Sequence, residues 1–566
     1  MRDAVRKKDD RPVMLEGCTA WPEEFARRYR EEGLWDGITL WEMLERVTKR
    51  VPDKTAIVWG DTRISYSELA ERIGCMAAGL AETGLRPRER VVVQLANGLD
   101  ILVTVFALLR IGVVPVMALP NHRLEEVALF VQHADAVAYF APDRLRDFDY
   151  RPMAAEIARR SVSLRHTFIL GEPWPGQLAL AGVPSSTAEA ADRIRDISPP
   201  TDEVALMLLS GGTTGVPKLI PRTHNDYVYN CRQCGRVAGF GPDTVFLAVL
   251  PMAHNYTLGC PGVFGALAWG GTAVIAPDTS ADTVFGLIAR EQVTVVSAAM
   301  PLAVNWLASD APEQYDLASL KVFMGGGAKL APELRARIER RFGCTYQESY
   351  GTGEGLICMT RLDAPDQVRM TSSGRPVSPA DEIKVIDADG HELPDGIVGE
   401  LACRGPYTIR GYYRAPAATA SAFTHDGFYR MGDAVRKIGN DLYFEGRLKD
   451  LINRGGEKIS CEEVENHLLA HPRIRSACVV AMPDAVYGER ACAFVIPSDD
   501  AALTLAEMKA FLLARQIAKF KLPERLELVS SFPLSPAGKV LRRELRRTIE
   551  TKLIDEQSAH NRSTEQ

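Results

Sequence analysis

Helix-like and strand-like segments alternate through most of this chain, and that alternation limits the folds open to it. Residues 65–85, SYSELAERIGCMAAGLAETGL, begin with the Ser-x-x-Glu pattern of a helix N-terminus and place apolar residues at helical spacing. The run RVVVQLA at 90–96 is typical of a buried strand, and residues 100–112 and 113–119 repeat the helix and the strand. Because parallel strands need long connections, the alternation predicts an α/β fold with parallel-rich sheets covered by helices.

Further strand-like runs continue this pattern toward the middle of the chain. They are TVFLAVL (244–250), GTAVIA (271–276), VTVVSAA (293–299) and LKVFMGGG (320–327). After about residue 370 the pattern changes, because residues 381–405 predict short antiparallel strands joined by Asp-Gly turns. We expect these strands to form a small barrel-like β part of the same large domain.

The last hundred residues predict a separate, smaller α+β unit. Its expected elements are the helix CEEVENHLLAH, the strands SACVVAMP and ACAFVIP, and a helix from Leu503. Since 566 residues exceed one ordinary core, we expect a large domain at 21–447 and a small mobile domain at 451–550, with a hinge between them. The polar ends, 1–20 and 551–566, are expected to be frayed.

Composition excludes several functional classes. A hydrophobic fraction of 46% and a charged fraction of 25% match globular proteins, and the net charge of −6 with scattered basic residues disfavours nucleic-acid binding. No apolar run reaches the ~18 residues of a membrane span, and no signal pattern opens the chain. We therefore predict a cytoplasmic protein with reduced thiols. Cys231 and Cys234 form an isolated CxxC, which favours buried or incidental thiols over a zinc or redox site.

A glycine-rich loop follows the apolar run at 204–208. Residues 208–224 read LLSGGTTGVPKLIPRTH. Backbone N–H groups of such a loop converge on phosphate oxygens, hydroxyl side chains add donors, and a lysine adds positive charge. A P-loop places its lysine directly after the last glycine, whereas Val and Pro separate Gly215 from Lys218 here. The loop alone is consistent with phosphate binding or with an ordinary surface loop.

Four later motifs decide between these readings of the loop. They are SYGTGEG (349–355), GFYRMGD (427–433), GRLKDLINRGGEKI (446–459) and PLSPAGK (533–539). In this order, and with the loop, they resemble the adenylate-forming superfamily of acyl-CoA synthetases, luciferases and nonribosomal peptide adenylation domains. The resemblance covers about residues 20 to 550. Within the superfamily, WPEEFARRYREEGLW, PRTHNDYVYN, MAHNYTLGCPG, RGPYTIRGYY and EEVENHLLAHP resemble the stand-alone aryl-acid adenylating enzymes of siderophore pathways.

The resemblance implies ATP and Mg²⁺ as cofactors and assigns residues to them. The implied nucleotide-binding residues are Ser210, Gly211, Gly212, Thr213, Thr214, Gly215, Lys218, Gly327, Ser349, Tyr350, Gly351, Thr352, Gly353, Asp433, Arg447, Lys449 and Lys458. Glu354 is expected to hold Mg²⁺, and Asp433 to accept hydrogen bonds from the ribose. Lys539 is expected to bridge the substrate carboxylate and the phosphate during adenylation, the alternative being a solvated lysine near a chain end.

The resemblance also implies a second half-reaction. After adenylation the small domain of such enzymes rotates, which removes the lysine and admits a phosphopantetheine thiol. Lys449 and Asp450 stand at the position of the family's hinge. The small Gly455 and Gly456 would leave room for the thiol arm. The implied acceptor is an aryl carrier protein, and CoA is the alternative.

The implied substrate-binding residues are His254, Asn255, Tyr256, Cys260, Gly325, Gly326 and Ile357. Amino-acid adenylating domains place an Asp near this position to bind an ammonium, whereas Asn255 offers a neutral amide that suits a 2-hydroxyl. Cys260 stands where salicylate enzymes have Cys and dihydroxybenzoate enzymes have Ser. This favours salicylate over 2,3-dihydroxybenzoate, although Cys260 is also consistent with a small core residue.

Three departures from the family pattern keep other acids open. Gly325 replaces a usual Val, Thr352 a usual Met, and Met300 a usual Pro. The first two remove side-chain bulk beside the expected ring pocket, so a substituted or larger aryl acid becomes an alternative. Two other functions also stay open: an aryl-CoA ligase, and a non-catalytic AMP-binding sensor, which would need neither Lys539 nor Glu354.

Overall fold

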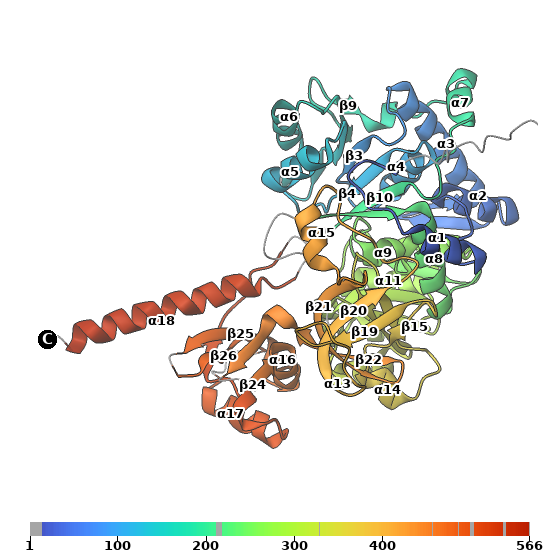
Figure 1. Cartoon of the computed structure of the whole chain (residues 1–566). Helices are drawn as coiled ribbons and strands as arrows, with labels where there is room; N and C mark the ends of the chain where they lie inside the picture. Colours follow the sequence, from blue (N-terminus) through green and yellow to red (C-terminus); the bar gives the residue numbers. More distant parts are fainter. Residues whose placement is uncertain are drawn as a thin grey trace, which may run out of the picture.

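The computed structural model describes residues 14–210, 218–327, 329–454, 457–484, 486–498, 503–535 and 539–564, without the side chains of Lys449, Lys458 and residues 557–564. Two large sheets with helices between and outside them form the bulk of the molecule (Figure 1). A small antiparallel sheet and a separate α+β unit follow toward the C-terminus. The α/β prediction is therefore confirmed.

The first large sheet has nine strands. In spatial order they are β18 (Arg375–Pro376), β17 (Ile357–Met359), β16 (Thr345–Gly351), β15 (Val322–Gly326), β14 (Val295–Ala299), β12 (Val245–Ala248), β13 (Thr272–Ile275), β1 (Thr55–Trp59) and β2 (Thr62–Ser65). The strands from β16 to β1 pair in parallel, and antiparallel strands close both edges. Each strand-like run predicted between 244 and 327 lies in this sheet.

The second large sheet has seven strands. In order they are β11 (Leu219–Thr223), β10 (Val204–Leu209), β4 (Val114–Met117), β3 (Arg90–Val93), β5 (Ala138–Pro142), β8 (His166–Leu170) and β9 (Leu178–Ala179). All neighbours pair in parallel except the hairpin of β10 and β11, which encloses the glycine-rich loop. A two-stranded hairpin, β6 (Arg144–Leu145) and β7 (Phe148–Asp149), lies apart from it.

Helices fill the space between the sheets and cover their outer faces. The central layer shares one hydrophobic cluster with both sheets and consists of α2 (Leu40–Arg50), α3 (Tyr66–Glu82), α4 (Leu99–Arg110), α8 (His224–Val237), α9 (Asn255–Gly259) and α10 (Gly262–Ala268). Outside the nine-stranded sheet lie α11 (Ala281–Glu291), α12 (Met300–Ala308) and α13 (Pro332–Phe342), and outside the seven-stranded sheet α5 (Leu124–Ala134) and α6 (Arg151–Arg160). The predicted capping box at Ser65 and Glu68 is present at the start of α3.

The remaining elements of the large domain are short or lie at its surface. They are α1 (Glu23–Glu31), α7 (Ala188–Arg195), α14 (Asp366–Thr371), α15 (Pro416–Ala422), η1 (Leu180–Gly182) and η2 (Ala311–Gln314). The predicted antiparallel strands form a four-stranded sheet of β19 (Glu382–Ile386), β20 (Val398–Arg404), β21 (Tyr429–Ile438) and β22 (Asp441–Arg447). Gly390 and Gly396, in the connection from β19 to β20, both have positive φ, as the predicted Asp-Gly turns require.

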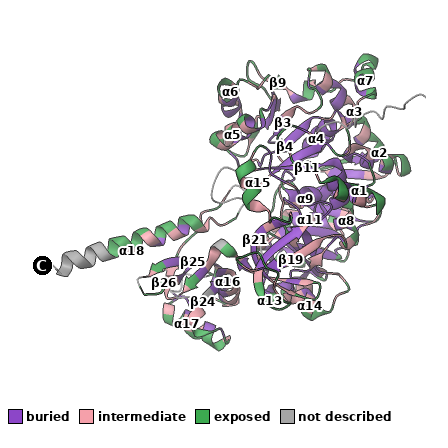
Figure 2. Ribbon diagram, in the orientation of Figure 1, coloured by how far each residue is buried: buried purple, intermediate pink, exposed green. Residues whose placement is uncertain are grey.

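The C-terminal unit follows η3 (Leu448–Asp450). It contains β23 (Leu451–Arg454), β24 (Glu457–Ser460), β25 (Ile474–Asp484), β26 (Gly488–Pro497), β27 (Arg525–Leu528), α16 (Cys461–Leu469), α17 (Leu505–Ala514), η4 (Lys519–Lys521) and α18 (Arg542–Thr564). One face of its sheet packs against α16 and α17, and the other against the first part of α18. From there α18 projects away from the rest of the molecule (Figure 1), and exposed residues recur along the part of it whose burial is described (Figure 2).

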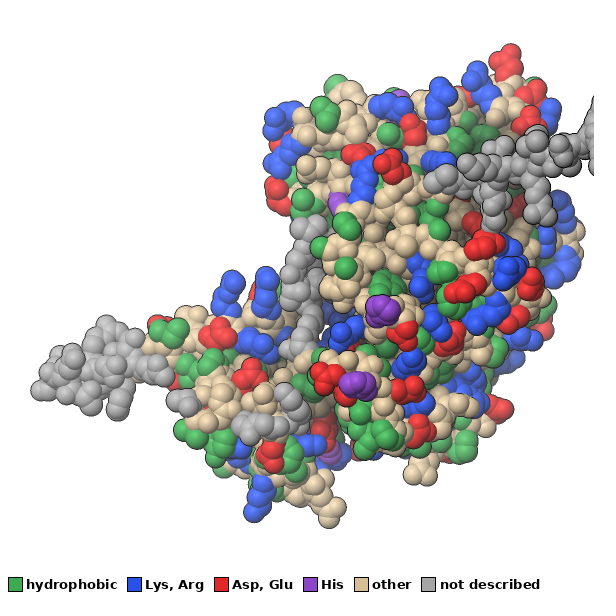
Figure 3. Space-filling model, in the orientation of Figure 1, with side chains coloured by type: hydrophobic (Ala, Val, Ile, Leu, Met, Phe, Trp, Pro, Cys, Tyr) green, Lys and Arg blue, Asp and Glu red, His purple; other side chains and the backbone are tan. Residues whose placement is uncertain are grey.

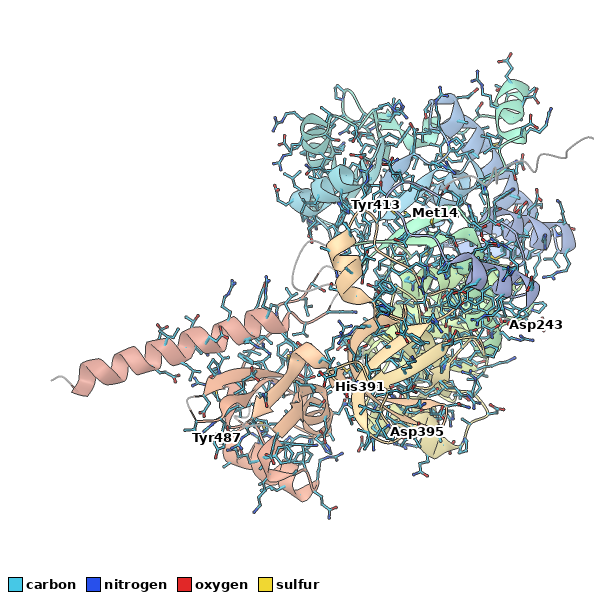
Figure 4. All side chains as sticks on the ribbon, viewed as in Figure 1. Met14, Asp243, His391, Asp395, Tyr413 and Tyr487 are labelled. Carbon is cyan, nitrogen blue, oxygen red and sulfur yellow. The ribbon has the colours of Figure 1, made fainter. Side chains whose placement is uncertain are left out.

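Described residues near both ends of the chain make contacts that the sequence does not suggest, whereas residues 1–13 of the expected N-terminal tail lie outside the described residues. Leu15 is buried and its backbone N–H donates to Glu203 Oε1 over 2.9 Å, while Met14 packs in the same cluster as Tyr413 (Figure 4). The expected frayed tail at 551–566 is instead helical to Thr564. Leu553 packs on the small domain, and Glu556 pairs with Arg525 at 2.6 Å, so an apolar contact and an ion pair hold this turn.

The surface carries charges of both signs. Lys and Arg side chains alternate with Asp and Glu over the face shown in Figure 3. This agrees with the scattered charge of the sequence. A search of the described helices found none with the length and apolar character needed to cross a bilayer.

Candidate functional site

Most of the described site residues stand at the carboxyl ends of strands or directly after them. Ser210 follows β10, Gly325 and Gly326 end β15, Ser349 to Gly351 end β16, and Arg447 ends β22. Ligands of open α/β sheets commonly bind at this edge of the strands. The fold thus gathers groups that are far apart in the sequence.

Ser210 and Lys218 close the base of the glycine-rich loop. The Ser210 backbone N–H donates to the Lys218 carbonyl over 3.0 Å, and the Lys218 N–H donates to Ser210 Oγ over 2.9 Å. The predicted phosphate-binding residues Gly211, Gly212, Thr213, Thr214 and Gly215 lie outside the described residues. The described part therefore fixes both ends of the loop.

Tyr412 connects Lys218 to Glu354. Lys218 Nζ lies 4.5 Å from the centre of the Tyr412 ring, and the Tyr412 hydroxyl donates to Glu354 Oε1 over 3.0 Å. The hydroxyl oxygen of a second tyrosine, Tyr429, lies 3.2 Å from the hydroxyl oxygen of Tyr412. Glu354 is buried, and among the described residues Tyr412 is the one side chain that donates to its carboxylate. A cation and a carboxylate are thereby held next to the mouth of the loop.

Asp433, Tyr350 and Arg447 form a second charged group. The Tyr350 hydroxyl donates to Asp433 Oδ2 over 2.7 Å, and Arg447 Nε lies 3.1 Å from Asp433 Oδ1. Burial, with a further contribution from the charge of Asp433, raises the pKa of Tyr350 well above its ordinary value. The three residues predicted around the ribose and base thus lie together.

Glycines at the end of β15 and β16 allow close approach of other groups. A Cβ on Gly326 would lie 2.6 Å from Tyr256 Cζ, and one on Gly351 would lie 2.4 Å from the Leu356 carbonyl oxygen. Gly327 has φ +86°, which favours glycine. Gly353 accepts a hydrogen bond from Arg222 at its carbonyl over 3.0 Å. The glycine-rich motifs therefore serve backbone geometry and the close packing of neighbouring groups.

The room expected beside Gly325 is already filled. A Cβ there would lie 1.9 Å from the Tyr346 hydroxyl oxygen. Tyr346 packs in the hydrophobic cluster on the outer face of the nine-stranded sheet. Cys260 packs in the cluster of the central helix layer, on the opposite face of that sheet. Gly325 thus adds no volume to a ring pocket near Cys260, which corrects the sequence argument at this position. Of the two bulk-removing changes, Thr352 alone remains as a source of space, and its hydroxyl is buried without a hydrogen-bond partner among the described residues.

Asn255, the first residue of α9, and Cys260, directly after α9, contact each other in the central helix layer. Asn255 Nδ2 donates to Cys260 Sγ over 3.2 Å, and Asn255 Oδ1 accepts from the Tyr227 hydroxyl over 2.8 Å. Asn230 Nδ2 lies 3.7 Å from the same sulfur. A hydrogen bond from Cys234, against the opposing effect of burial, lowers the pKa of Cys260. His254 caps α9 by accepting the Tyr256 N–H, and Ile357 lies buried on β17.

The CxxC lies inside the central layer. Cys231 and Cys234 are buried on α8, and all eleven cysteines are free thiols. Within the described residues, the one cluster with metal-ligand geometry is Asp387, Asp389 and His391, at the exposed turn between β19 and β20. The reading of the CxxC as buried thiols therefore fits the structure.

Lys539 lies on the small domain, shortly before α18. Its backbone N–H donates to Ser535 Oγ over 3.1 Å. The surrounding protein, with a further contribution from the charge of Lys539, lowers the pKa of His254 to about 4, although the His254 side chain itself is exposed. His254 is the direct neighbour of Asn255 in the chain.

Contacts between the domains hold this arrangement. The Lys329 backbone N–H donates to Glu462 Oε1 over 3.2 Å, and Arg515 pairs with Glu333 at 2.7 Å. At the predicted hinge, the Asp450 carbonyl accepts from Cys461 Sγ over 2.8 Å. Lys449 lies in η3 and Lys458 in β24, and the structure describes neither side chain.

Two residues of the site were not singled out from the sequence. Tyr412 lies in RGPYTIRGYY and Tyr227 in PRTHNDYVYN, stretches that the sequence analysis used only as whole motifs. Their partners, Glu354 and Asn255, are 58 and 28 residues away in the chain. The motifs marked the right segments, but local spacing does not reveal which side chain points into the site.

Comparison with known proteins extends these observations. The sequence pattern of the family described as "AMP-binding enzyme" matches residues 44–413, and that of the "AMP-binding enzyme C-terminal domain" matches residues 463–539. The chain is 45% identical to a 2,3-dihydroxybenzoate-AMP ligase of Bacillus subtilis, over 96% of this chain and 99% of that protein. It is 46% identical to the pyochelin synthase PchD of Pseudomonas aeruginosa, over 96% and 98%.

A solved structure agrees with the fold. The apo structure of MbtA from Mycobacterium smegmatis superposes with a TM-score of 0.73 at 39% identity, covering 94% of this chain and 99% of that one. Both domains and all of the described site lie inside the matched length. The chain therefore belongs to the AMP-binding enzyme family of adenylate-forming ligases.

Proposed function

We propose that this protein is a ligase that joins an aryl carboxylic acid to AMP, releases pyrophosphate, and then transfers the acyl group to a phosphopantetheine thiol. The observation that carries the proposal is that two charged groups lie at the strand ends. One is Lys218 with Tyr412 and Glu354 beside the glycine-rich loop, and the other is Asp433 with Tyr350 and Arg447. We propose that Lys539 of the small domain adds a cation between the acid and the phosphates.

The adenylation step brings two anions together, because a carboxylate oxygen attacks the α-phosphorus of ATP. Positive charge must therefore offset repulsion in the transition state. Lys218 supplies it at the loop that is proposed to hold the β- and γ-phosphates, and Lys539 supplies it at the reacting oxygens. Asp433 accepts hydrogen bonds from the ribose hydroxyls, and Tyr350 borders the base.

Glu354 fits the role of a Mg²⁺ ligand. Tyr412 occupies one carboxylate oxygen, so in the described structure the other is available to a hard cation that prefers oxygen ligands. When bound, Mg²⁺ would neutralise phosphate charge. The chain's own contribution is to hold Glu354 in place through Tyr412 and to place Lys218 beside it.

Asn255 and Cys260 support an aryl acid over an amino acid. Asn255 is neutral and its described partners, Tyr227 and Cys260, leave no carboxylate beside it to pair with an ammonium. A thiol suits a bare ring edge better than it suits a hydroxyl, which favours salicylate. The Bacillus subtilis relative is named for 2,3-dihydroxybenzoate, so that acid is the second candidate.

For the second half-reaction we propose a carrier protein of siderophore or nonribosomal peptide synthesis as acceptor. The small domain would rotate about Lys449 and Asp450, which withdraws Lys539 and opens a path for the thiol. CoA is the alternative acceptor, and transfer assays with each separate them. Because the reaction consumes ATP, we place it in the cytoplasm, as predicted.

An acid-dependent pyrophosphate–ATP exchange assay tests the proposal. Wild-type enzyme should exchange label with salicylate or 2,3-dihydroxybenzoate, and Lys539→Ala should abolish exchange while ATP still binds. Lys519→Ala is the matched control, since this exposed lysine lies on η4 of the same small domain. Exchange by Lys539→Ala at the wild-type rate, or no exchange by wild type with any aryl acid, would overturn the proposal and favour an AMP sensor.

A further inference from the structure

We propose that Tyr227 fixes the orientation of the Asn255 amide, so that the site selects acids whose ortho substituent accepts a hydrogen bond. The inference rests on the proposed function, because it concerns the acid that is activated. It assigns Tyr227 as a positioning residue. It also makes a hydroxyl the favoured ortho group and an amine the disfavoured one.

Tyr227 is placed to act only as a donor toward Asn255. It is fully buried on α8, and its hydroxyl donates to Asn255 Oδ1 over 2.8 Å. Within the described residues this is the one hydrogen bond of that hydroxyl. A Cβ on Gly259 would lie 2.6 Å from the same oxygen, so the chain packs closely around it. Turning the amide over would leave the buried hydroxyl hydrogen without an acceptor.

Arg222 strengthens this donor. Its guanidinium lies 4.8 Å from the centre of the Tyr227 ring and is held by Asp226, 2.8 Å away. Both charged side chains are fully buried. A cation over a phenol ring is attracted to its electron density and polarises the O–H bond. The ion pair therefore favours donation by Tyr227 over acceptance.

The other end of the amide is fixed independently. Asn255 Nδ2 donates to Cys260 Sγ over 3.2 Å. An amide nitrogen carries two hydrogens and an amide oxygen carries none. One hydrogen of Asn255 Nδ2 engages Cys260, and one lone pair of Oδ1 accepts from Tyr227, so one N–H and one lone pair are left. The nitrogen end lies on the side of Cys260, which the proposed function places at the ring edge, and the oxygen end lies on the side of Tyr227. We infer that the remaining N–H is the group turned toward a bound acid.

This polarity discriminates between similar benzoates. In salicylate the hydroxyl hydrogen bonds internally to the carboxylate, so the hydroxyl oxygen turns a lone pair outward and accepts the Asn255 N–H. In anthranilate the amine uses one hydrogen internally and turns the second outward, where it meets another N–H. An amine at this position leaves both donors without an acceptor, which is costly in a buried site.

The specificity ratio of two acids tests the inference. We measure kcat/KM in pyrophosphate exchange for salicylate and for anthranilate. Wild type should prefer salicylate by at least a hundredfold. Tyr227→Phe should lower that ratio at least tenfold, because the released amide can turn its oxygen toward the amine. Tyr229→Phe is the matched control, since its buried hydroxyl contacts Ser378 at 2.7 Å and not Asn255. Its ratio should stay at the wild-type value.

A second variant covers the case in which Tyr227→Phe fails to fold. Asn255→Asp keeps the side-chain size, and one oxygen still accepts from Tyr227, but the other presents an acceptor to the acid. It should favour anthranilate over salicylate. Equal loss of activity on both acids in the two variants would mean a structural role only and overturns the inference. Absence of exchange by wild type with any 2-hydroxybenzoate would instead overturn the proposed function.

Discussion

Replacing Gly325 by alanine tests whether the space beside β15 is packed or open. The new Cβ would lie 1.9 Å from Tyr346 Oη and 2.5 Å from Tyr346 Cζ. Tyr346 cannot move away easily, because it is fully buried and its ring stacks on Phe323 with centroids 6.2 Å apart. Its hydroxyl also donates to Glu348 Oε2 over 2.6 Å, and that carboxylate pairs with buried Arg335 at 3.0 Å.

Two costs follow from this geometry. Overpacking of a filled core costs about 1–3 kcal/mol. If Tyr346 shifts enough to lose its hydrogen bond, the buried Glu348 carboxylate loses a donor, which costs about 1–3 kcal/mol more. We therefore expect Gly325→Ala to lower the free energy of unfolding of the large domain by roughly 2–6 kcal/mol. Urea denaturation followed by tryptophan fluorescence reports this domain, because all seven tryptophans lie in it.

The double variant Gly325→Ala/Tyr346→Phe separates the clash from other effects. Phenylalanine lacks the oxygen nearest to the new methyl group, so the two substitutions should be less destabilising together than the sum of the single changes. Neighbouring residues of this kind couple by about 0.5–3 kcal/mol. If Gly325→Ala is as stable as wild type and shifts activity toward smaller acids, the space belongs to the substrate pocket and our reading is refuted.

Three further predictions concern the nucleotide, the ring and the domain contact. Asp433→Asn weakens the contacts to Tyr350 and Arg447, so it should raise the KM for ATP about tenfold, near 1.4 kcal/mol, and leave the KM for the acid unchanged. A variant with the same KM for ATP as the wild type would contradict the assignment. Cys260→Ser should shift preference from salicylate toward 2,3-dihydroxybenzoate in pyrophosphate exchange, and an unmoved ratio would exclude Cys260 as a determinant. Burial, with the charge of Glu465, raises the pKa of Glu462 from 4.5 to about 8. Contact between the small and the large domain thus favours the protonated Glu462 carboxyl, so this contact should weaken as pH rises from about 5 to 8. Small-angle scattering would follow the separation of the domains, and Glu462→Gln should remove its dependence on pH.

The sequence predicted the elements well because their patterns are local. The capping box at Ser65 and the Asp-Gly turns between β19 and β20 both follow from short-range spacing. The space beside Gly325 was misjudged because its occupant, Tyr346, comes from the next strand. Parallel pairing sets Gly325 opposite Glu348 and brings Tyr346 onto the same face, and no local pattern gives that register.

A related limit applies at the described residues near the start of the chain. Residues 1–20 look polar as a group, yet Leu15 fits an apolar cluster and its backbone reaches Glu203, 188 residues away. The side chains around Asn255 show the same limit, since Tyr227 comes from another helix. Motifs identify which segments meet at the site, whereas the direction of each side chain depends on contacts across the fold.

In the proposed function, acid recognition and nucleotide recognition use different parts of this molecule. Tyr227, Asn255 and Cys260 lie in the buried central layer. Asp433 and Arg447 lie on the antiparallel sheet directly before the proposed hinge, and Lys539 lies beyond it on the small domain. A change in the central layer should therefore alter which acid is activated without altering ATP binding. We expect movement about the proposed hinge to bring Lys539 in or withdraw it while the acid stays in place.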